Sequence, residues 1–255
     1  CTIMDNLSYW GPGGVTVSGT GLVERCVIAA NRIQNSGVGG VYLYYGGILR
    51  NSLVYRNSEK STVAGVACDN GGSVQNCAIV SNYATASGGG AYIGTNGTLR
   101  NCVVAFNLAE TAGGVKCYRG GYLDNCTIAT NEAISTAGGV ACESGGTLQG
   151  SIVWGNVAPS SANWWNSASN GWKYTCVCTF PTVAGTWNIT NNPAFVDMLA
   201  GYFYLATNSP CINKGTNLPW TVQGTDLEGF PRILGGIADI GAFERSAGHY
   251  VAPNG

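Results

Sequence analysis

Residues 77–101, CAIVSNYATASGGGAYIGTNGTLRN, are followed at once by residues 102–125, CVVAFNLAETAGGVKCYRGGYLDN. Both segments open with Cys, carry Asn at the sixth position and contain a Gly-Gly-apolar phrase near the middle. The opening phrase recurs at intervals of 25, 26, 25, 25, 24 and 25 residues, starting at Cys1, Cys26, Ser52, Cys77, Cys102, Cys126 and Ser151. A fixed period of this length indicates a repeat architecture.

Each period contains three short phrases that alternate apolar with polar or small residues, as β-strands do. Residues 1–156 contain no long run with helical spacing. Short strands separated by Gly and Asn bends can form a coil in which each strand pairs in parallel with its equivalent one turn later. We therefore predict an all-β fold, a single-stranded right-handed parallel β-helix of about seven to nine rungs spaced about 4.8 Å apart, with an irregular C-terminal cap.

Residues at the same phase of the repeat form columns. One apolar column is expected inside the coil and comprises Val15, Val41, Val66, Ala91, Val115 and Val140. A second interior column comprises Val17, Leu43, Cys68, Ile93, Cys117 and Cys142. The column between them varies in size and polarity, as an outward-facing column should, and comprises Thr16, Tyr42, Ala67, Tyr92, Lys116 and Ala141.

Two columns are rich in asparagine. The sixth position of the opening phrase is always Asn: Asn6, Asn31, Asn57, Asn82, Asn107, Asn131 and Asn156. Amides stacked on successive rungs can bond to one another along the axis, so we expect a structural Asn ladder at this corner. The position before the Cys or Ser holds Asn51, Asn76, Asn101 and Asn125. Because Asn tolerates left-handed backbone, we expect a sharp bend there.

The cysteines follow the repeat. We expect a core stack in which Cys acts as a small apolar residue, formed by Cys26, Cys77, Cys102 and Cys126 in one column and Cys68, Cys117 and Cys142 in another. A metal site is not expected, because no His accompanies these thiols and no CxxC spacing occurs. A disulfide that ties a rung to the cap is possible among Cys176, Cys178 and Cys211.

The regular rungs cover residues 1–156, and residues 157–245 are expected to form irregular last rungs and a cap of the same domain. Residues 246–255 are expected to form a tail or a linker to a following module. Cys1 already occupies the repeat column. We therefore expect a missing upstream turn to be supplied by other sequence, so that the partners are copies of the chain or adjoining modules, end to end.

Composition limits the function. Charged residues make up 10% of the chain, the net charge is −1, and Gly accounts for 39 of 255 residues. A chain so nearly neutral lacks the basic surface of a nucleic-acid-binding protein. No run of eighteen apolar residues occurs, so this segment is not expected to insert into a membrane.

Residues 1–156 resemble the right-handed parallel β-helix repeat of bacterial surface proteins. The Gly-Gly-apolar phrases, with Ala105-Phe106-Asn107 at one corner, are also similar to chlamydial polymorphic outer-membrane proteins. The last third resembles the closing segment of choice-of-anchor surface proteins, in stretches such as Ser209–Gly215 and Asp239–Glu244. The resemblance implies an extracellular or cell-surface location. A leucine-rich repeat is the main alternative, but the chain lacks Leu enrichment and a helical segment in each period.

Candidate sites are few. Pectate-lyase-like enzymes share the predicted fold and use clustered carboxylates with calcium. Asp69, Lys116, Arg119 and Glu143 lie near one strand edge, but Asp69 and Glu143 should be three rungs, roughly 14 Å, apart. Outward tyrosines could stack on sugars: Tyr42, Tyr44, Tyr92 and Tyr118.

In the cap, a network of Arg and carboxylates is expected to close the fold, with a calcium site as the alternative; its members are Asp226, Glu228, Arg232, Asp239 and Glu244.

We therefore expect an extracellular structural or adhesive β-solenoid, a subunit or segment of a longer rod or filament. The alternative is a β-helix that binds or cleaves polysaccharides. No catalytic residue is predicted, and no cofactor other than a possible calcium ion.

Overall fold

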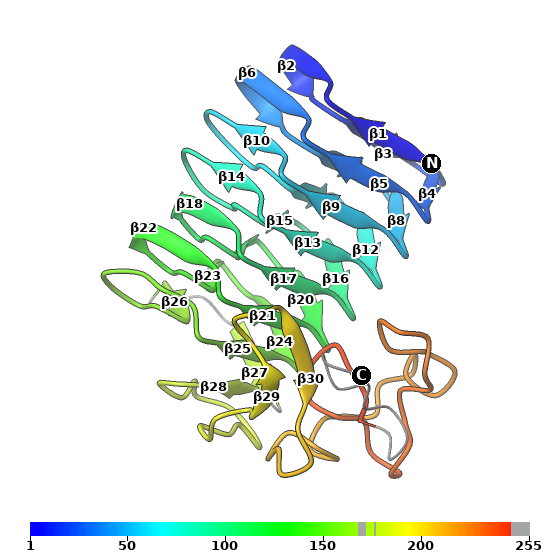
Figure 1. Cartoon of the computed structure of the whole chain (residues 1–255), viewed down its shortest axis with the longest axis vertical. Coiled ribbons are helices and arrows are strands. Elements are labelled where there is room, and N and C mark those ends of the chain that lie inside the picture. The colour runs from blue at the N-terminus through cyan, green and yellow to red at the C-terminus, as the bar shows by residue number, and fades with distance from the viewer. Residues whose placement is uncertain (168–171, 176, 246–255) are drawn as a thin grey trace.

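A computed structural model describes residues 1–167, 172–175 and 177–245. The chain winds into a stack of about seven turns, each lying on the one before (Figure 1). Within these residues no helix is long and apolar enough to cross a membrane. The predicted parallel β-helix is confirmed.

Four parallel sheets, here called A to D, run along the stack. Sheet A contains β1 (Thr2–Met4), β5 (Val27–Ala29), β9 (Leu53–Tyr55), β13 (Ala78–Val80), β17 (Val103–Ala105), β21 (Thr127–Ala129), β25 (Ile152–Trp154) and β28 (Cys178–Thr179). Sheet B contains β2 (Leu7–Pro12), β6 (Arg32–Val38), β10 (Ser58–Glu59), β14 (Tyr83–Ala84), β18 (Leu108–Thr111) and β22 (Glu132–Thr136).

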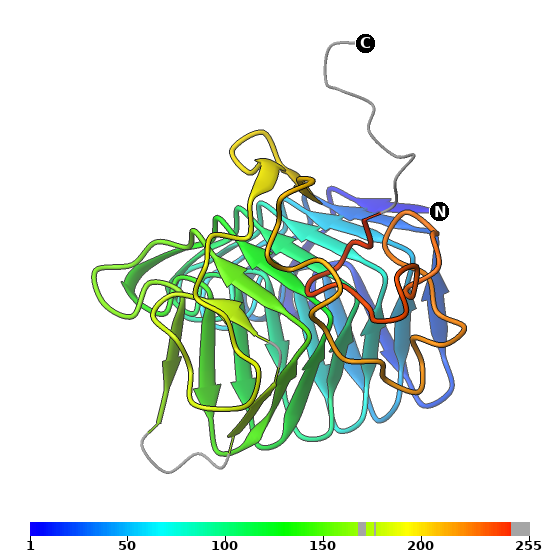
Figure 2. The ribbon, with the colours of Figure 1, turned by 90° about the horizontal axis from the view of Figure 1, so that it is seen from below.

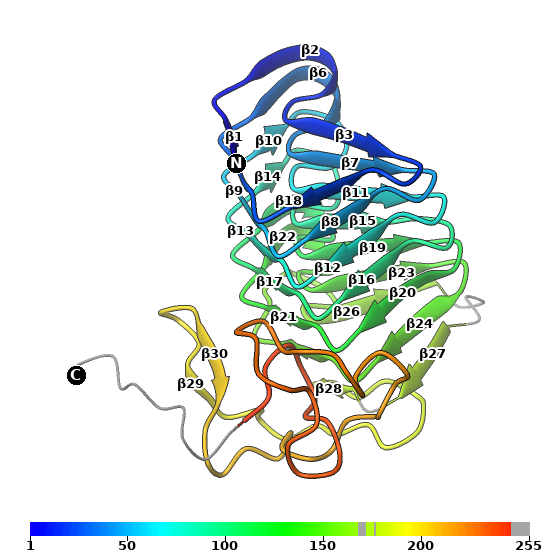
Figure 3. The ribbon, with the colours of Figure 1, turned by 90° about the vertical axis from the view of Figure 1, so that its right-hand side faces the viewer.

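Sheet C contains β3 (Val15–Ser18), β7 (Val41–Tyr44), β11 (Val66–Asp69), β15 (Ala91–Ile93), β19 (Val115–Tyr118), β23 (Val140–Glu143) and β26 (Trp164–Asn166). Sheet D contains β4 (Leu22–Glu24), β8 (Ile48–Arg50), β12 (Ser73–Gln75), β16 (Thr98–Arg100), β20 (Gly121–Asp124), β24 (Gly146–Gln149) and β27 (Trp172–Thr175). Figures 2 and 3 show the same stack along and across its axis.

The expectation of three strands per rung was wrong, because each regular rung has four. The extra strand belongs to sheet B and follows the Asn corner. Its strands are as short as two residues in β10 and β14, and their sequences, Ser-Glu and Tyr-Ala, share no apolar pattern. Hydrogen bonding to neighbouring rungs forms these strands, so sequence periodicity did not reveal them.

Like residues meet along the axis. In sheet C, Val41 pairs with both Val15 and Val66, and the register continues through Ala91, Val115 and Val140. Both predicted interior columns contribute to one buried hydrophobic core, which Val177 and Val183 extend past the last regular rung.

The predicted Asn ladder is continuous. Each Asn side chain donates its Nδ2–H to the Oδ1 of the Asn on the next rung, over distances of 2.8 to 3.0 Å from Asn6 to Asn156. Asn156 in turn donates to Asn163 Oδ1 at 3.1 Å, so the ladder has one more member than the sequence suggested. Because the ladder residues from Asn31 to Asn156 are buried and their amides are bonded on several sides, they stabilise the corner between sheets A and B.

The Asn ladder leaves no room for a side chain at the second Gly of each Gly-Gly-apolar phrase. The second Gly of each phrase lies against the Asn amides: a Cβ on Gly114 would meet Asn131 Nδ2 at 2.9 Å and Ile128 Cγ2 at 2.9 Å. A side chain at this position would therefore displace either the ladder or the core.

The second Asn column forms the bend between sheets D and A. Asn51, Asn76, Asn101 and Asn125 all have φ between 49° and 51°, in the left-handed region. A further left-handed corner directly precedes the ladder and holds Asp5, Ala30, Arg56, Ser81, Phe106 and Thr130. Because these residue types are mixed, intrinsic preference does not explain their left-handed backbone. We infer that the ladder bonds of the following Asn stabilise this conformation.

The cap lies against the C-terminal half of sheet A. The antiparallel strands β29 (Phe195–Asp197) and β30 (Tyr202–Leu205) place Phe203 on Val103, Ala105 and Ala129 (Figure 1). Cap carbonyls also accept hydrogen bonds from the second Asn column, because Asn101 Nδ2 donates to Thr225 O at 3.0 Å. The cap therefore covers the later rungs through both apolar and amide contacts.

Candidate functional site

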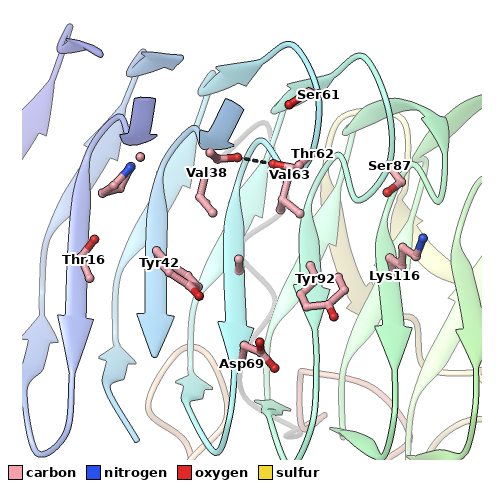
Figure 4. A pocket seen from close by; sticks show the side chains of 14 residues that line it. Thr16, Val38, Tyr42, Ser61, Thr62, Val63, Asp69, Ser87, Tyr92 and Lys116 are labelled. Carbon is pink, nitrogen blue, oxygen red and sulfur yellow. Dashed lines mark hydrogen bonds between the residues drawn. The ribbon is translucent and has the colours of Figure 1, made fainter. Parts of the chain in front are cut away.

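A groove of about 630 Å³ runs over the outer face of sheet C (Figure 4). Its floor is formed by side chains of β3, β7, β11, β15 and β19. Its rim is formed by the ends of β2 and β6 and by the turns that follow β10 and β14. The lining residues are Gly11, Pro12, Thr16, Gly37, Val38, Tyr42, Ser61, Thr62, Val63, Ala67, Asp69, Ser87, Tyr92 and Lys116. The groove thus crosses several rungs along the helix axis.

Two tyrosines dominate the floor. Tyr42 and Tyr92 both pair with Ala67, one from each side, so they lie two rungs, about 10 Å, apart. Both rings pack on an apolar cluster of Val38, Val63 and Ala67. Because this packing restricts the rings before any ligand arrives, little ordering entropy remains to be lost on binding.

The other predicted tyrosines occupy the neighbouring outward column. Tyr44 pairs with Asp69, and Tyr118 pairs with Glu143. The ring of Tyr44 lies 5.5 Å from that of Tyr42 and 4.0 Å from that of Tyr45, measured between centroids. These residues flank the groove and support its edge, whereas Tyr42 and Tyr92 line it.

Asp69 lies between the two floor tyrosines, two residues beyond Ala67 on strand β11 (Figure 4). Its Oδ1 accepts a hydrogen bond from the backbone N–H of Asn70 at 2.9 Å. Burial raises the pKa of the Tyr92 hydroxyl to about 12, and the negative charge of Asp69 contributes to this rise. Burial and then Asp69 also raise the pKa of Tyr42, so both phenols stay protonated at neutral pH.

Lys116 lines the far end of the groove and is paired. Its Nζ forms an ion pair with Glu143 Oε1 at 3.5 Å. Arg119 lies beside the groove with its guanidinium 4.8 Å from the centre of the Tyr118 ring. The strand register separates Asp69 from Glu143 by three rungs, so the structure does not bring these carboxylates together.

A buried carboxylate that the sequence analysis missed shapes the rim. Glu59 is 2% exposed and occupies a sheet B column that holds Ala84, Ala109 and Ala133 in later rungs. Its carboxylate accepts hydrogen bonds from the backbone N–H groups of Ser61 and Thr62, and from the Ser61 hydroxyl at 3.0 Å. In the sequence, the one sign of this buried carboxylate is that Glu59 stands at a position of the repeat where the later rungs have Ala.

The predicted core cysteines are all buried free thiols. Burial raises the pKa of Cys68 to about 12 and the pKa of Cys117 well above its ordinary value. The pKa of Cys102 is also raised, because this thiol is buried and contacts Cys126 and Cys77. Thiols that resist ionisation are poor nucleophiles and poor metal ligands, so their environment suits packing.

Cys178 and Cys211 share a small core with Ile152, Leu205 and Ile240, where β28 meets the cap. Contact with the Cys211 thiol, together with burial, raises the pKa of Cys178. Both residues are free thiols in this structure. Their disulfide stays a prediction, and Cys176 lies outside the described residues.

The charged cluster of the cap surrounds Arg232, whose Nε and Nη1 find no hydrogen-bond partner among the described residues. Arg232 is fully buried, donates to Asp239 O at 2.9 Å and lies 3.9 Å from Glu244. The Asp226, Asp239 and Glu244 carboxylates accept backbone N–H bonds. Glu228 lies outside this core and accepts a bond from the Tyr204 hydroxyl at 2.6 Å.

Within the described ranges no group of three or more His, Cys, Asp or Glu side chains is arranged to hold a metal ion. Calcium binding by the cap stays a prediction, which a chelator titration of thermal stability would test.

No known family profile matches this chain, and no curated protein matches it. Among solved structures, it is similar to the crystal structure of pectate lyase Pel9A, with 15% identity over 96% of this chain and 72% of that chain, at a TM-score of 0.45. Such similarity is too low to assign a shared activity. The resemblance to bacterial surface repeat proteins likewise stays a prediction.

Proposed function

We propose that this protein is an extracellular, adhesive β-helix that binds an extended polysaccharide in the groove over sheet C. One observation carries the proposal. Tyr42 and Tyr92 lie two rungs apart on a rigid apolar floor, with Ala67 between them and a carboxylate, Asp69, at the edge.

The geometry suits a glycan chain that runs along the helix axis. An aromatic face stacks on the C–H face of a pyranose ring, and the two rings are about a disaccharide repeat apart. The sugar ring between them would lie over the small Ala67, where Asp69 can accept hydrogen bonds from its hydroxyl groups. The rim residues Ser61 and Thr62 add hydroxyls on the opposite side.

Binding fits the groove better than cleavage does. Acid–base cleavage of a glycosidic bond generally uses two carboxyl groups on opposite sides of that bond. The lining of the groove supplies one carboxylate, Asp69, and Glu143 is engaged by Lys116. Release of reducing or unsaturated ends from a bound glycan would therefore contradict a purely binding role.

Affinity electrophoresis in gels that contain single polysaccharides tests the proposal. Tyr42→Ala and Tyr92→Ala should each weaken retardation about tenfold, because one stacked ring is lost. Tyr122→Ala, on sheet D and 42% exposed, is the matched control and should change nothing. Unchanged retardation in both groove variants would contradict the proposal.

A second candidate function is end-to-end assembly into a rod. In the first rung, β1 to β4 each pair on one side within the described residues. Leu7, Trp10 and Leu22 there are 62%, 63% and 48% exposed. A further rung from an adjoining module or a second copy would cover them. Light scattering across a concentration series tests assembly of copies, and Leu22→Lys should abolish any growth in mass.

A further inference from the structure

We propose that the groove selects an uncharged, hydroxyl-rich glycan over a polymer of uronic acids, and that Asp69 determines this selection. This inference rests on the proposed function, namely that the groove over sheet C binds a glycan. It adds the chemical class of the ligand and names the residue that discriminates.

The charges of the groove do not favour an anion. Two charged side chains line it, Asp69 and Lys116. The Lys116 ammonium is already matched by Glu143 at 3.5 Å, whereas Asp69 forms no ion pair with any described residue. The nearby cation Arg119 lies on the Tyr118 ring and outside the lining. Asp69 therefore presents an unpaired negative charge to the ligand, and a bound uronate would meet no free cation in the lining to offset it.

The hydrogen-bonding capacity of the lining side chains also favours an uncharged sugar. The Ser61 hydroxyl already donates to Glu59, and the Thr62 hydroxyl donates to the backbone oxygen of Gly37. Their remaining capacity is as acceptors, and the Asp69 carboxylate can only accept. A ligand group that meets Ser61, Thr62 or Asp69 must therefore donate a hydrogen bond, whereas the protonated phenols of Tyr42 and Tyr92 can donate one to the ligand. Sugar hydroxyls donate, but a uronate carboxylate cannot.

The position of Asp69 makes it the discriminating group. Strand β11 supplies both Ala67, which lies between the two tyrosine rings, and Asp69. A sugar seated over Ala67 therefore presents its edge to the Asp69 carboxylate. A hydroxyl at that edge would form a charge-assisted bond, and a carboxylate would face a like charge.

Calorimetric titration of the full chain with defined hexasaccharides tests the inference. The neutral probes are cellohexaose, mannohexaose, xylohexaose and hexa-N-acetylchitohexaose, and the acidic probe is hexagalacturonate. At low salt, the best neutral probe should bind at least about tenfold more tightly than hexagalacturonate. Its affinity should be nearly independent of added salt, because no ligand charge is screened.

Asp69→Asn removes the charge and keeps the size of the side chain. Affinity for the neutral probe should fall about threefold, because a charge-assisted bond becomes a neutral one, and affinity for hexagalacturonate should rise about tenfold. Glu110→Gln, which removes an exposed carboxylate on sheet B outside the lining, is the charge-matched control and should leave the ratio unchanged.

Tighter binding of hexagalacturonate than of every neutral probe, or an unchanged ratio in Asp69→Asn, would overturn the inference while leaving glycan binding intact. Failure of all five probes to bind would overturn the proposed function together with the inference. Tyr92→Phe keeps the ring and should bind within about twofold of the parent, which separates stacking from a folding defect in Tyr92→Ala.

Discussion

Gly94 lies directly beneath the carboxylate of Asp69, so that a methyl group on its Cα would overlap Asp69 Oδ1 and come within 2.9 Å of Tyr92 Cε1. The neighbouring rungs carry Asp69 and Tyr118 at this register position. The missing side chain at Gly94 therefore creates the space in which Asp69 and Tyr92 share the edge of the groove.

Gly94→Ala should displace Asp69 from the groove. We expect about threefold to tenfold weaker binding of a neutral hexasaccharide, with a loss of about 1 kcal/mol in the free energy of unfolding from the new contacts. Calorimetry and urea denaturation measure the two effects. Thr95→Ala, in the same turn, should change neither, and full affinity in Gly94→Ala would show that Asp69 does not act from this position.

Glu59→Ala should loosen the rim without removing a lining side chain. The backbone amides of Ser61 and Thr62 would lose their acceptor. Hydrogen exchange at these amides should accelerate, and unfolding should cost about 1–2 kcal/mol less. Glycan affinity should fall about threefold, since the rim is less ordered before binding. Glu110→Ala, also in sheet B but exposed, is the control; equal exchange at residues 61 and 62 in both variants would contradict this role.

Asn82→Ala should break the ladder in its middle. The Asn82 side chain accepts from the N–H and the Nδ2 of Asn57, and it donates to Asn107 Oδ1 and to Val54 O. Its loss leaves buried groups without partners, and we expect about 2–4 kcal/mol of destabilisation in chemical unfolding. Asn51→Gly, at the exposed left-handed bend, should cost less than about 1 kcal/mol, because Gly tolerates that backbone. An equal loss in the free energy of unfolding for Asn82→Ala and Asn51→Gly would contradict a stabilising role for the ladder.

The sequence predicts those features that recur on every rung. A column such as Val15, Val41 and Val66 is visible because each residue meets its own kind one turn later, so that packing imposes the same choice repeatedly. The Asn ladder is visible for the same reason. The identity of the tyrosines as outward residues follows from strand alternation, which places them on the face opposite the core.

Features that occur once are not predicted. The groove depends on turns that connect sheet B to sheet C, and their paths differ between rungs. Glu59 acts in one turn, and Asn163 joins the ladder only seven residues after Asn156, outside the period. The pairing of Asp69 with the space over Gly94 depends on the exact strand register, and no local pattern in the sequence marks it.

Cys178 and Cys211 should form a disulfide under oxidising conditions. Glutathione disulfide would take two electrons and two protons from the two thiols and leave as two molecules of glutathione, as one S–S bond breaks in the oxidant and one forms in the protein. Because the bond would tie β28 to the cap, we expect about 3 kcal/mol of stabilisation. Non-reducing peptide mapping should find this pair linked and Cys117 and Cys142 reduced. Finding Cys178 paired with Cys176 would contradict the assignment.

Glu244 should make the stability of the cap depend on pH. Burial raises the pKa of this carboxyl from 4.5 to about 7. Between these values the folded state keeps a proton that the unfolded state has lost, so stability declines as pH rises from about 4.5 to about 7, by about 2–3 kcal/mol in total. Glu244→Gln cannot titrate, and its Tm should be nearly flat from pH 5 to pH 8, whatever its absolute level. Glu228→Gln, an exposed neighbour, should keep the parent's slope. A Glu244→Gln variant with that same slope would show that another group causes the dependence.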